Sequence, residues 1–275
     1  MINHPTVQLR PENKLKILDF GEIWEFRFLL LRLARRDLVL RYRQTVLGVL
    51  WVVLQPLLAS GVLAFVFGTI ANLPSEGVPY YVLSYAGFLG WSAFSAVLAK
   101  STGVLLSNSS LVSKVYFPRI LLPLSTIGST LVDVAVASIV MVVMLVTAGI
   151  EIGPRILLVP LLLIGFLVTA AGIGCAAAAL AVPYRDIAVV IPVLTQLLLY
   201  GSPVAYSLSA VPGIGRQIMR FNPLTGFLEA MRWSLLPGRS LDLRLLLLSC
   251  LVASVTLLCG LLVFNKFERN FADVI

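Results

Sequence analysis

Residues 24–71 constrain the fold of this chain more than any other stretch, because a basic amphipathic segment runs into a long apolar one with no break signal between them. In residues 24–43, apolar side chains recur at helical spacing on one side and charged side chains on another. Such a helix lies in the headgroup layer of a membrane. Residues 46–71 carry no charge, and at about 1.5 Å per residue they are long enough to cross an apolar core of about 30 Å. The stretch therefore predicts a surface helix followed by a first transmembrane span.

The composition extends this prediction to the whole chain. Of its 275 residues, 59% are hydrophobic and only 12% are charged, whereas charged residues approach about a quarter of a soluble protein. We expect an all-α integral membrane protein with six transmembrane helices, at residues 46–71, 80–99, 120–148, 156–182, 187–207 and 243–264. Residues 1–45 would form a cytoplasmic N-terminus with the amphipathic interface helix, 46–264 the transmembrane domain, and 265–275 a cytoplasmic C-terminus.

Basic residues predict the orientation. Most of the 21 Lys and Arg residues fall in segments that this layout leaves inside. By the positive-inside rule, both termini are then cytoplasmic. We expect a multi-pass protein of the cytoplasmic (inner) membrane of a bacterium, and no nucleic-acid binding, because the basic residues border apolar spans.

The segment 208–244 departs from the pattern of the spans. It is too polar to cross a bilayer, yet it carries enough apolar residues to stay near one. Prolines and glycines divide it into pieces at 215–221 and 224–236, which predict re-entrant or surface gate helices on the outer side. Arginines crowd this segment, and Arg216, Arg220 and Arg232 are candidates for contact with an anionic headgroup or substrate. Snorkelling of the same arginines to lipid phosphate is the alternative.

No catalytic constellation is found in the sequence. The only histidine is His4, there is no paired-carboxylate motif, and no GxxxxGK[ST] phosphate loop occurs. We therefore expect no catalytic residue, metal site or cofactor in this chain, so that ATP and Mg would be bound by a partner subunit. Asp133 is the clearest ionisable group within a span. A structural, hydrogen-bonded or protonated Asp133 is favoured over a proton relay.

Six short motifs resemble, in order and spacing, the signature of polysaccharide-export ABC transporter permeases, the membrane subunits that move O-antigen, capsule or teichoic acid chains. They are RDLVLRYRQTVLGVLW at 36–51 continuing to Gln55-Pro56, KVYFPR at 114–119, PYRD at 183–186, SPV at 202–204, NPL at 222–224 and FADVI at 271–275.

The resemblance implies a homodimer with two copies of a separate nucleotide-binding ATPase subunit. It assigns the surface helix to the family's interface helix, with Arg32, Arg36, Asp37, Arg41 and Arg43 as its charged residues. It assigns residues 110–119 to a coupling helix and the turn at 185–186 to a second ATPase contact. The ATPase-coupling candidates are Ser110, Lys114, Val115, Tyr116, Phe117, Pro118, Arg119, Arg185 and Asp186. An apolar knob with charged flanks suits a buried hot spot with a polar rim, although anchoring of this loop in the membrane is an alternative.

A lipid-linked polysaccharide is the expected substrate, and it would pass through a channel at the dimer seam. Aromatic side chains stack on sugar faces with few directional bonds, which lets a long chain slide. The channel-lining candidates are Trp51, Phe65, Phe67, Tyr85, Phe88, Trp91, Tyr200 and Tyr206. The alternatives are an ABC permease for teichoic acid, a drug or another lipid, and a membrane-embedded glycolipid enzyme.

Overall fold

The structure, a computed structural model, describes residues 20–43, 50–75, 77–268 and 271. Within these residues every regular element is a helix. The elements are α1 (Phe20–Glu25), α2 (Arg27–Tyr42), α3 (Leu50–Ala64), the π-helix η1 (Phe65–Ile70), α4 (Tyr80–Ser107), α5 (Ser109–Lys114), α6 (Leu121–Thr147), the 3₁₀ helix η2 (Pro154–Leu158), α7 (Val159–Ala181), α8 (Ile187–Tyr200), the 3₁₀ helix η3 (Leu208–Ala210), α9 (Gly213–Arg220), α10 (Thr225–Leu235) and α11 (Leu243–Glu268).

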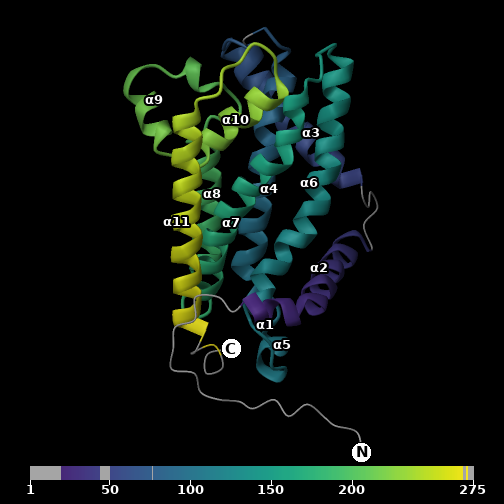
Figure 1. The fold of residues 1–275 in the computed structure, drawn as a ribbon, viewed down its shortest axis with the longest axis vertical. Helices are drawn as coiled ribbons and strands as arrows, with labels where there is room; N and C mark the ends of the chain where they lie inside the picture. Colours follow the sequence, from purple (N-terminus) through teal and green to yellow (C-terminus); the bar gives the residue numbers. More distant parts are fainter. Residues whose placement is uncertain (1–19, 44–49, 76, 269–270, 272–275) are drawn as a thin grey trace, which may run out of the picture.

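Five helical segments of the described chain are long and apolar enough to cross a membrane. They are Leu50–Ile70, α4, α6, Pro154–Ala181 and α11, and the shorter apolar α8 accompanies them. The prediction of an all-α integral membrane protein is confirmed. The long helices run side by side (Figure 1), with α1 and α5 at one end of the bundle and α9 at the other. We call these the basal end and the distal end.

Helix α4 lies at the centre of the bundle and packs against α3, α6, α7, α8 and α10. Glycines let the neighbouring elements come close to it. A Cβ atom at Gly90 would lie 2.5 Å from the ring of Phe166, and one at Gly87 would lie 2.1 Å from the carbonyl oxygen of Val204. The main core therefore forms where α4, α7 and α10 meet.

Small residues also set the contact between α7 and α11, as the glycines and alanines of 165–181 suggest. A Cβ atom at Gly260 would lie 2.0 Å from the Gly172 carbonyl oxygen, so the two backbones touch. In lipid, close backbone approach of this kind drives helix association, because apolar side chains alone gain little there.

Several boundaries differ from the sequence prediction. The surface helix does not run on unbroken towards the first span, because α2 ends at Tyr42 and Arg43 has an extended backbone. Helix α4 continues past the predicted end of the second span to Ser107, because buried Val104 and Leu105 continue its apolar face. Helix α8 ends at Tyr200, where the chain turns, rather than continuing to residue 207. The predicted start of the first span at residue 46 lies outside the described residues, as do residues 1–19 and, apart from Phe271, the C-terminal residues from 269 on.

Candidate functional site

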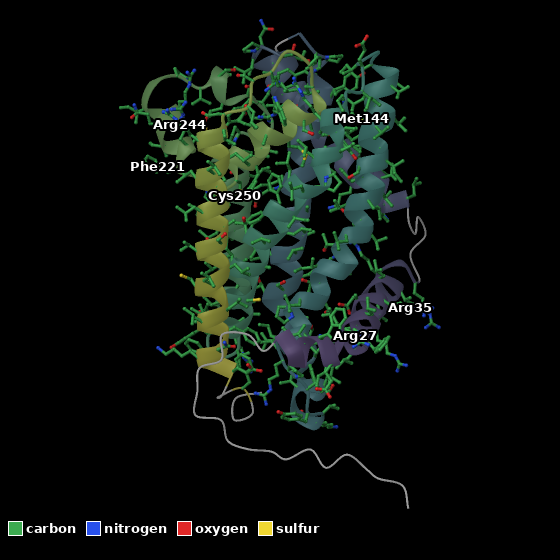
Figure 2. The ribbon with its side chains drawn as sticks, viewed as in Figure 1. Arg27, Arg35, Met144, Phe221, Arg244 and Cys250 are labelled. Carbon is green, nitrogen blue, oxygen red and sulfur yellow. The ribbon has the colours of Figure 1, made fainter. Side chains whose placement is uncertain are left out.

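Helix α2 slants upward from the basal end and packs on α6 through Leu33 and Ala34, which are both buried. Its outward side carries exposed Phe28 and Leu31 beside exposed arginines, and Arg35 points away from the bundle (Figure 2). The guanidinium of Arg27 lies over the Phe28 ring at 4.6 Å. Exposed apolar and cationic side chains on one helix suit the membrane interface.

Three charged side chains from three helices meet beside α2, and we call them the ion cluster: Arg41 of α2, Lys100 of α4 and Asp133 of α6. Both cations form ion pairs with the Asp133 carboxylate, Lys100 at 3.4 Å. The Lys100 ammonium also donates to Thr130 Oγ1 at 3.0 Å. The structure therefore supports the structural reading of Asp133, held here by two cations.

A second polar contact ties α2 to the start of α5. The Arg36 guanidinium donates to the Asn108 side-chain oxygen at 2.8 Å and to Asp37 Oδ1 at 3.0 Å. Asn108 is the residue between α4 and α5. Through this contact and the ion cluster, α2 is bonded to α4, to α6 and to the α4–α5 junction.

Two cavities meet at the ion cluster. The basal cavity, of about 870 Å³, lies between α2, α4, α5 and α6, and its cationic lining residues are Arg36, Arg41, Lys100 and Lys114. The intramembrane groove, of about 550 Å³, lies between α3, α4, α6 and α8. Arg41 and Lys100 line both cavities, so charged groups stand between them.

The intramembrane groove combines aromatic and uncharged polar side chains. Phe88 and Trp91 of α4 line it, together with Gln55 of α3 and Gln196 of α8. Amide groups in an otherwise apolar bundle are costly unless they serve binding or packing. A groove of this size lies within the usual range for a ligand site, about 300–1,000 Å³.

Some residues of the predicted coupling segment are exposed and others are buried. Tyr116 follows α5 at the basal end and is 70% exposed, and Val115 beside it is also exposed. Phe117 is only 5% exposed, because its ring belongs to the core that also contains Leu121 and Phe264. The predicted knob of three apolar residues is therefore wrong at Phe117, while the coupling candidates Ser110 and Lys114 are exposed.

Arg119 is likewise not a rim residue. Its guanidinium donates to the backbone oxygen of Glu268 at the end of α11 at 2.7 Å and lies over the Phe271 ring. Pro118 beside it is half-buried. The turn between α7 and α8 presents Tyr184, Arg185 and Asp186, which are all exposed. Among the coupling candidates, the exposed residues thus lie in α5, directly after it, and in this turn.

The aromatic candidates fall into three groups. Tyr85 was a wrong candidate, because it is fully buried and its hydroxyl donates to the Ala137 carbonyl oxygen at 3.0 Å. Phe88 and Trp91 line the intramembrane groove. Trp51, Phe65 and Tyr200 are exposed, whereas the half-buried Phe67 packs against Tyr206 with ring centroids 5.6 Å apart, nearer the distal end.

Arg232 is the clearest correction among the outer arginines. Its side chain is 0% exposed, and it donates to the Pro203 and Val204 carbonyl oxygens, each at 2.7 Å, and to Glu229 Oε1 at 2.8 Å. It therefore fixes the 203–204 turn to α10 and does not face a headgroup. Helix α10 itself is largely buried against α4, α7 and α11.

The sequence analysis did not identify three residues of these sites, namely Gln55, Lys100 and Gln196. The predicted span at 80–99 ends just before Lys100, although the spacing of Leu98, Thr102 and Leu105 continues the helix. Gln55 and Gln196 stand alone in apolar runs, and that signal was available.

Apolar helices of membrane-crossing length around a partly polar groove are typical of a membrane transport protein. Comparison with known proteins identifies the family of the chain. Residues 29–236 match the ABC-2 type transporter family, and the chain belongs to this family.

Relatives resemble the chain over most of its length. It is 26% identical over 250 residues to an O-antigen export system permease protein RfbA of Klebsiella pneumoniae, which covers 90% of this chain and 95% of the relative. It is 25% identical over 256 residues to RfbA of Myxococcus xanthus, covering 92% and 98%. It is 24% identical over 239 residues to the polysialic acid transport protein KpsM of Escherichia coli, covering 85% and 91%. These relatives are transporter permeases rather than enzymes.

Proposed function

We propose that this chain is the membrane-spanning permease subunit of an ABC transporter that exports a lipid-linked polysaccharide, similar to an O-antigen, across the cytoplasmic membrane of a bacterium. The names of the relatives, O-antigen export and polysialic acid transport, support this cargo class. Their matches extend over nearly their whole length, so the comparison concerns complete permeases.

The observation that carries the proposal is the intramembrane groove and its junction with the basal cavity. Half-buried Phe88 offers a ring face for sugar stacking, with buried Trp91 behind the groove wall, while Gln55 and Gln196 offer amide donors and acceptors. Away from the ion cluster, the neutral polar and aromatic wall suits a long glycan that must slide, because no single contact there holds it strongly.

The proposal assigns the basal end to the cytoplasm, in keeping with the positive-inside rule. Four cationic side chains then line a cavity open to the side where a lipid-linked glycan is made. Charge-assisted hydrogen bonds from arginine and lysine to phosphate are among the strongest polar contacts in proteins. The basal cavity would thus receive the phosphate-bearing headgroup of the lipid carrier.

ATP and Mg would be bound by a separate ATPase subunit docked on the basal end. Exposed Tyr116 would enter that subunit, with Arg185 and Asp186 as a second contact. Movement of α5 would reach α2 through the Arg36–Asn108 contact and would reach α6 through the ion cluster. Nucleotide would in this way bias the membrane helices between two arrangements.

The active permease would be a homodimer with two copies of the ATPase subunit. Helix α8 is apolar and has no buried residue in the single chain. Since α3 and α8 both border the intramembrane groove, a second copy packed on them would close the groove from lipid.

The experiment is a gene deletion in the source bacterium, complemented by the wild-type chain or by Phe88→Ala, because Phe88 lines the groove and is only half-buried. We expect loss of surface polysaccharide with accumulation of lipid-linked polymer inside the cell, restoration by wild type, and reduced export by Phe88→Ala at equal protein level. Normal surface polysaccharide in the deletion strain would overturn the cargo assignment. A changed sensitivity to drugs in its place would point to another ABC cargo.

A further inference from the structure

The arginines at the distal end gather around one cavity that no catalytic or transport role above uses. We call it the distal cavity; it has a volume of about 310 Å³. Its cationic lining residues are Arg216 and Arg220 of α9 and Arg239 of the α10–α11 loop, and its hydroxyl-bearing residues are Ser207, Ser209 and Ser240. The volume lies at the low end of ligand sites, which fits a headgroup better than a larger molecule.

The charges of the distal cavity leave an excess of cations. Glu229 pairs with buried Arg232 at 2.8 Å and with Arg239 at 3.7 Å, and Asp242 lies 3.9 Å from Arg220. The lining itself holds three guanidinium groups, of Arg216, Arg220 and Arg239, and two carboxylates, of Glu229 and Asp242, so it carries a net positive charge that favours an anion.

The position of α9 indicates how the anion arrives. Helix α9 projects beside the distal end of α11 (Figure 1), and its principal contacts are with η3 and α10. Ile214, Ile218 and Phe221 are exposed along α9, with Phe221 80% exposed at its lower edge (Figure 2). An amphipathic helix of this kind buries its apolar side among acyl chains and keeps its cations at headgroup level.

We propose that the distal cavity binds the phosphate group of an anionic membrane lipid in the outer leaflet. Ile214, Ile218 and Phe221 contact the acyl chains, while Arg216, Arg220 and Arg239 surround the phosphate. The orientation rests on the proposed function, but the binding chemistry does not depend on the cargo. Two classes of lipid combine a phosphate with a net negative charge: anionic phospholipids and isoprenyl diphosphates.

This inference differs from simple snorkelling in one testable respect. Snorkelling needs only an arginine near the interface, whereas a built site needs arginines that share a cavity. Arg244 provides the matched control, because it is exposed at the start of α11, at the same end of the molecule, and does not line the distal cavity (Figure 2).

The test measures binding to the purified full-length chain, fluorescently labelled, in uncharged detergent. The probes are a short-chain phosphatidylglycerol, farnesyl diphosphate and, as a control with no net charge, a short-chain phosphatidylcholine. We expect the double substitution Arg216→Gln with Arg220→Gln to weaken the tighter anionic probe at least about tenfold, equivalent to about 1.4 kcal/mol. Arg244→Gln should change it less than about twofold, equivalent to about 0.4 kcal/mol. Whichever anionic probe binds more tightly identifies the source of the phosphate.

The site is refuted if phosphatidylcholine binds as tightly as both anionic probes, or if Arg244→Gln weakens binding as much as the double substitution does. Arg216 also donates to the backbone oxygens of Ser209 and Val211, so the double variant could lose its fold. In that case Arg220→Gln alone is the test, with a melting curve to show that the variant is folded. An unchanged affinity of folded Arg220→Gln for the anionic probe contradicts the proposal. Export is not measured here, so failure of this site and failure of the proposed function are distinguishable.

Discussion

Replacing Asp133 by Asn should destabilise the protein, because the substitution leaves Arg41 and Lys100 without their shared counter-charge. Breaking a buried ion pair by removing one partner costs about 3–5 kcal/mol, whereas exposed pairs contribute about 0.2–1 kcal/mol. The Asp133 side chain is 15% exposed and that of Arg41 is 41% exposed, so the pair lies between these limits. We expect a loss of about 2 kcal/mol. For a chain of this size, that lowers Tm by roughly 4–8 °C.

The assay is thermal unfolding of the purified protein in detergent, followed by tryptophan fluorescence. Glu151→Gln is the matched control, because Glu151 is an exposed acid in the loop between α6 and η2, and its loss should change stability by less than about 0.5 kcal/mol. Arg41→Gln and the double variant complete a double-mutant cycle, in which the Arg41–Asp133 coupling should reach about 1 kcal/mol.

Two results would refute the structural role of Asp133. One is an unchanged Tm for Asp133→Asn, and the other is simple additivity of the two single substitutions in the cycle. If Asp133→Asn kept its Tm and its cellular level but abolished export, the proton-relay reading would replace the structural one.

Two further predictions use the same purified protein and its complex with the ATPase. Tyr116→Ala should leave Tm unchanged but allow ATP hydrolysis without export. Phe117→Ala, in contrast, should lower the free energy of unfolding by about 3–5 kcal/mol, because its ring is buried. Normal export by Tyr116→Ala would contradict the assignment of Tyr116 to the ATPase contact. Gly260→Leu should lower the free energy of unfolding by at least about 3 kcal/mol or fail to accumulate, since a Cβ atom there meets the backbone of α7. Gly103→Ala, at a position that faces open space, should raise the free energy of unfolding by about 0.5–1 kcal/mol. Equal melting curves for the two variants would disprove the close packing of α7 and α11.

The fold class follows from the sequence because long apolar runs have few alternatives to crossing a membrane. The small residues of 165–181 likewise predict close helix packing, which Gly172 and Gly260 realise. Burial within the bundle could not be predicted in the same way. The sequence offered Tyr85 and Phe117 as contact residues, but both are buried. The Ala137 carbonyl oxygen accepts a hydrogen bond from Tyr85, and Phe117 packs in the core that also contains Leu121 and Phe264.

Charged residues were placed least well, because their partners come from distant parts of the chain. Arg232 was grouped with Arg216 and Arg220 by proximity in sequence, yet its acceptors lie in the 203–204 turn and at Glu229. The sequence identified Asp133 as the clearest ionisable group within a span, but nothing in the sequence around Asp133 indicated that Arg41 is its partner.

Transport measured in vesicles of defined composition tests most directly whether this permease depends on an ATPase partner. The purified chain is reconstituted with a lipid-linked polysaccharide, with and without the ATPase subunit, and both ATP hydrolysis and movement of the glycan are followed. We expect neither activity from the chain alone, and both once the ATPase and Mg-ATP are added. Hydrolysis of ATP or net movement of the glycan by the chain alone would contradict the proposed division of labour.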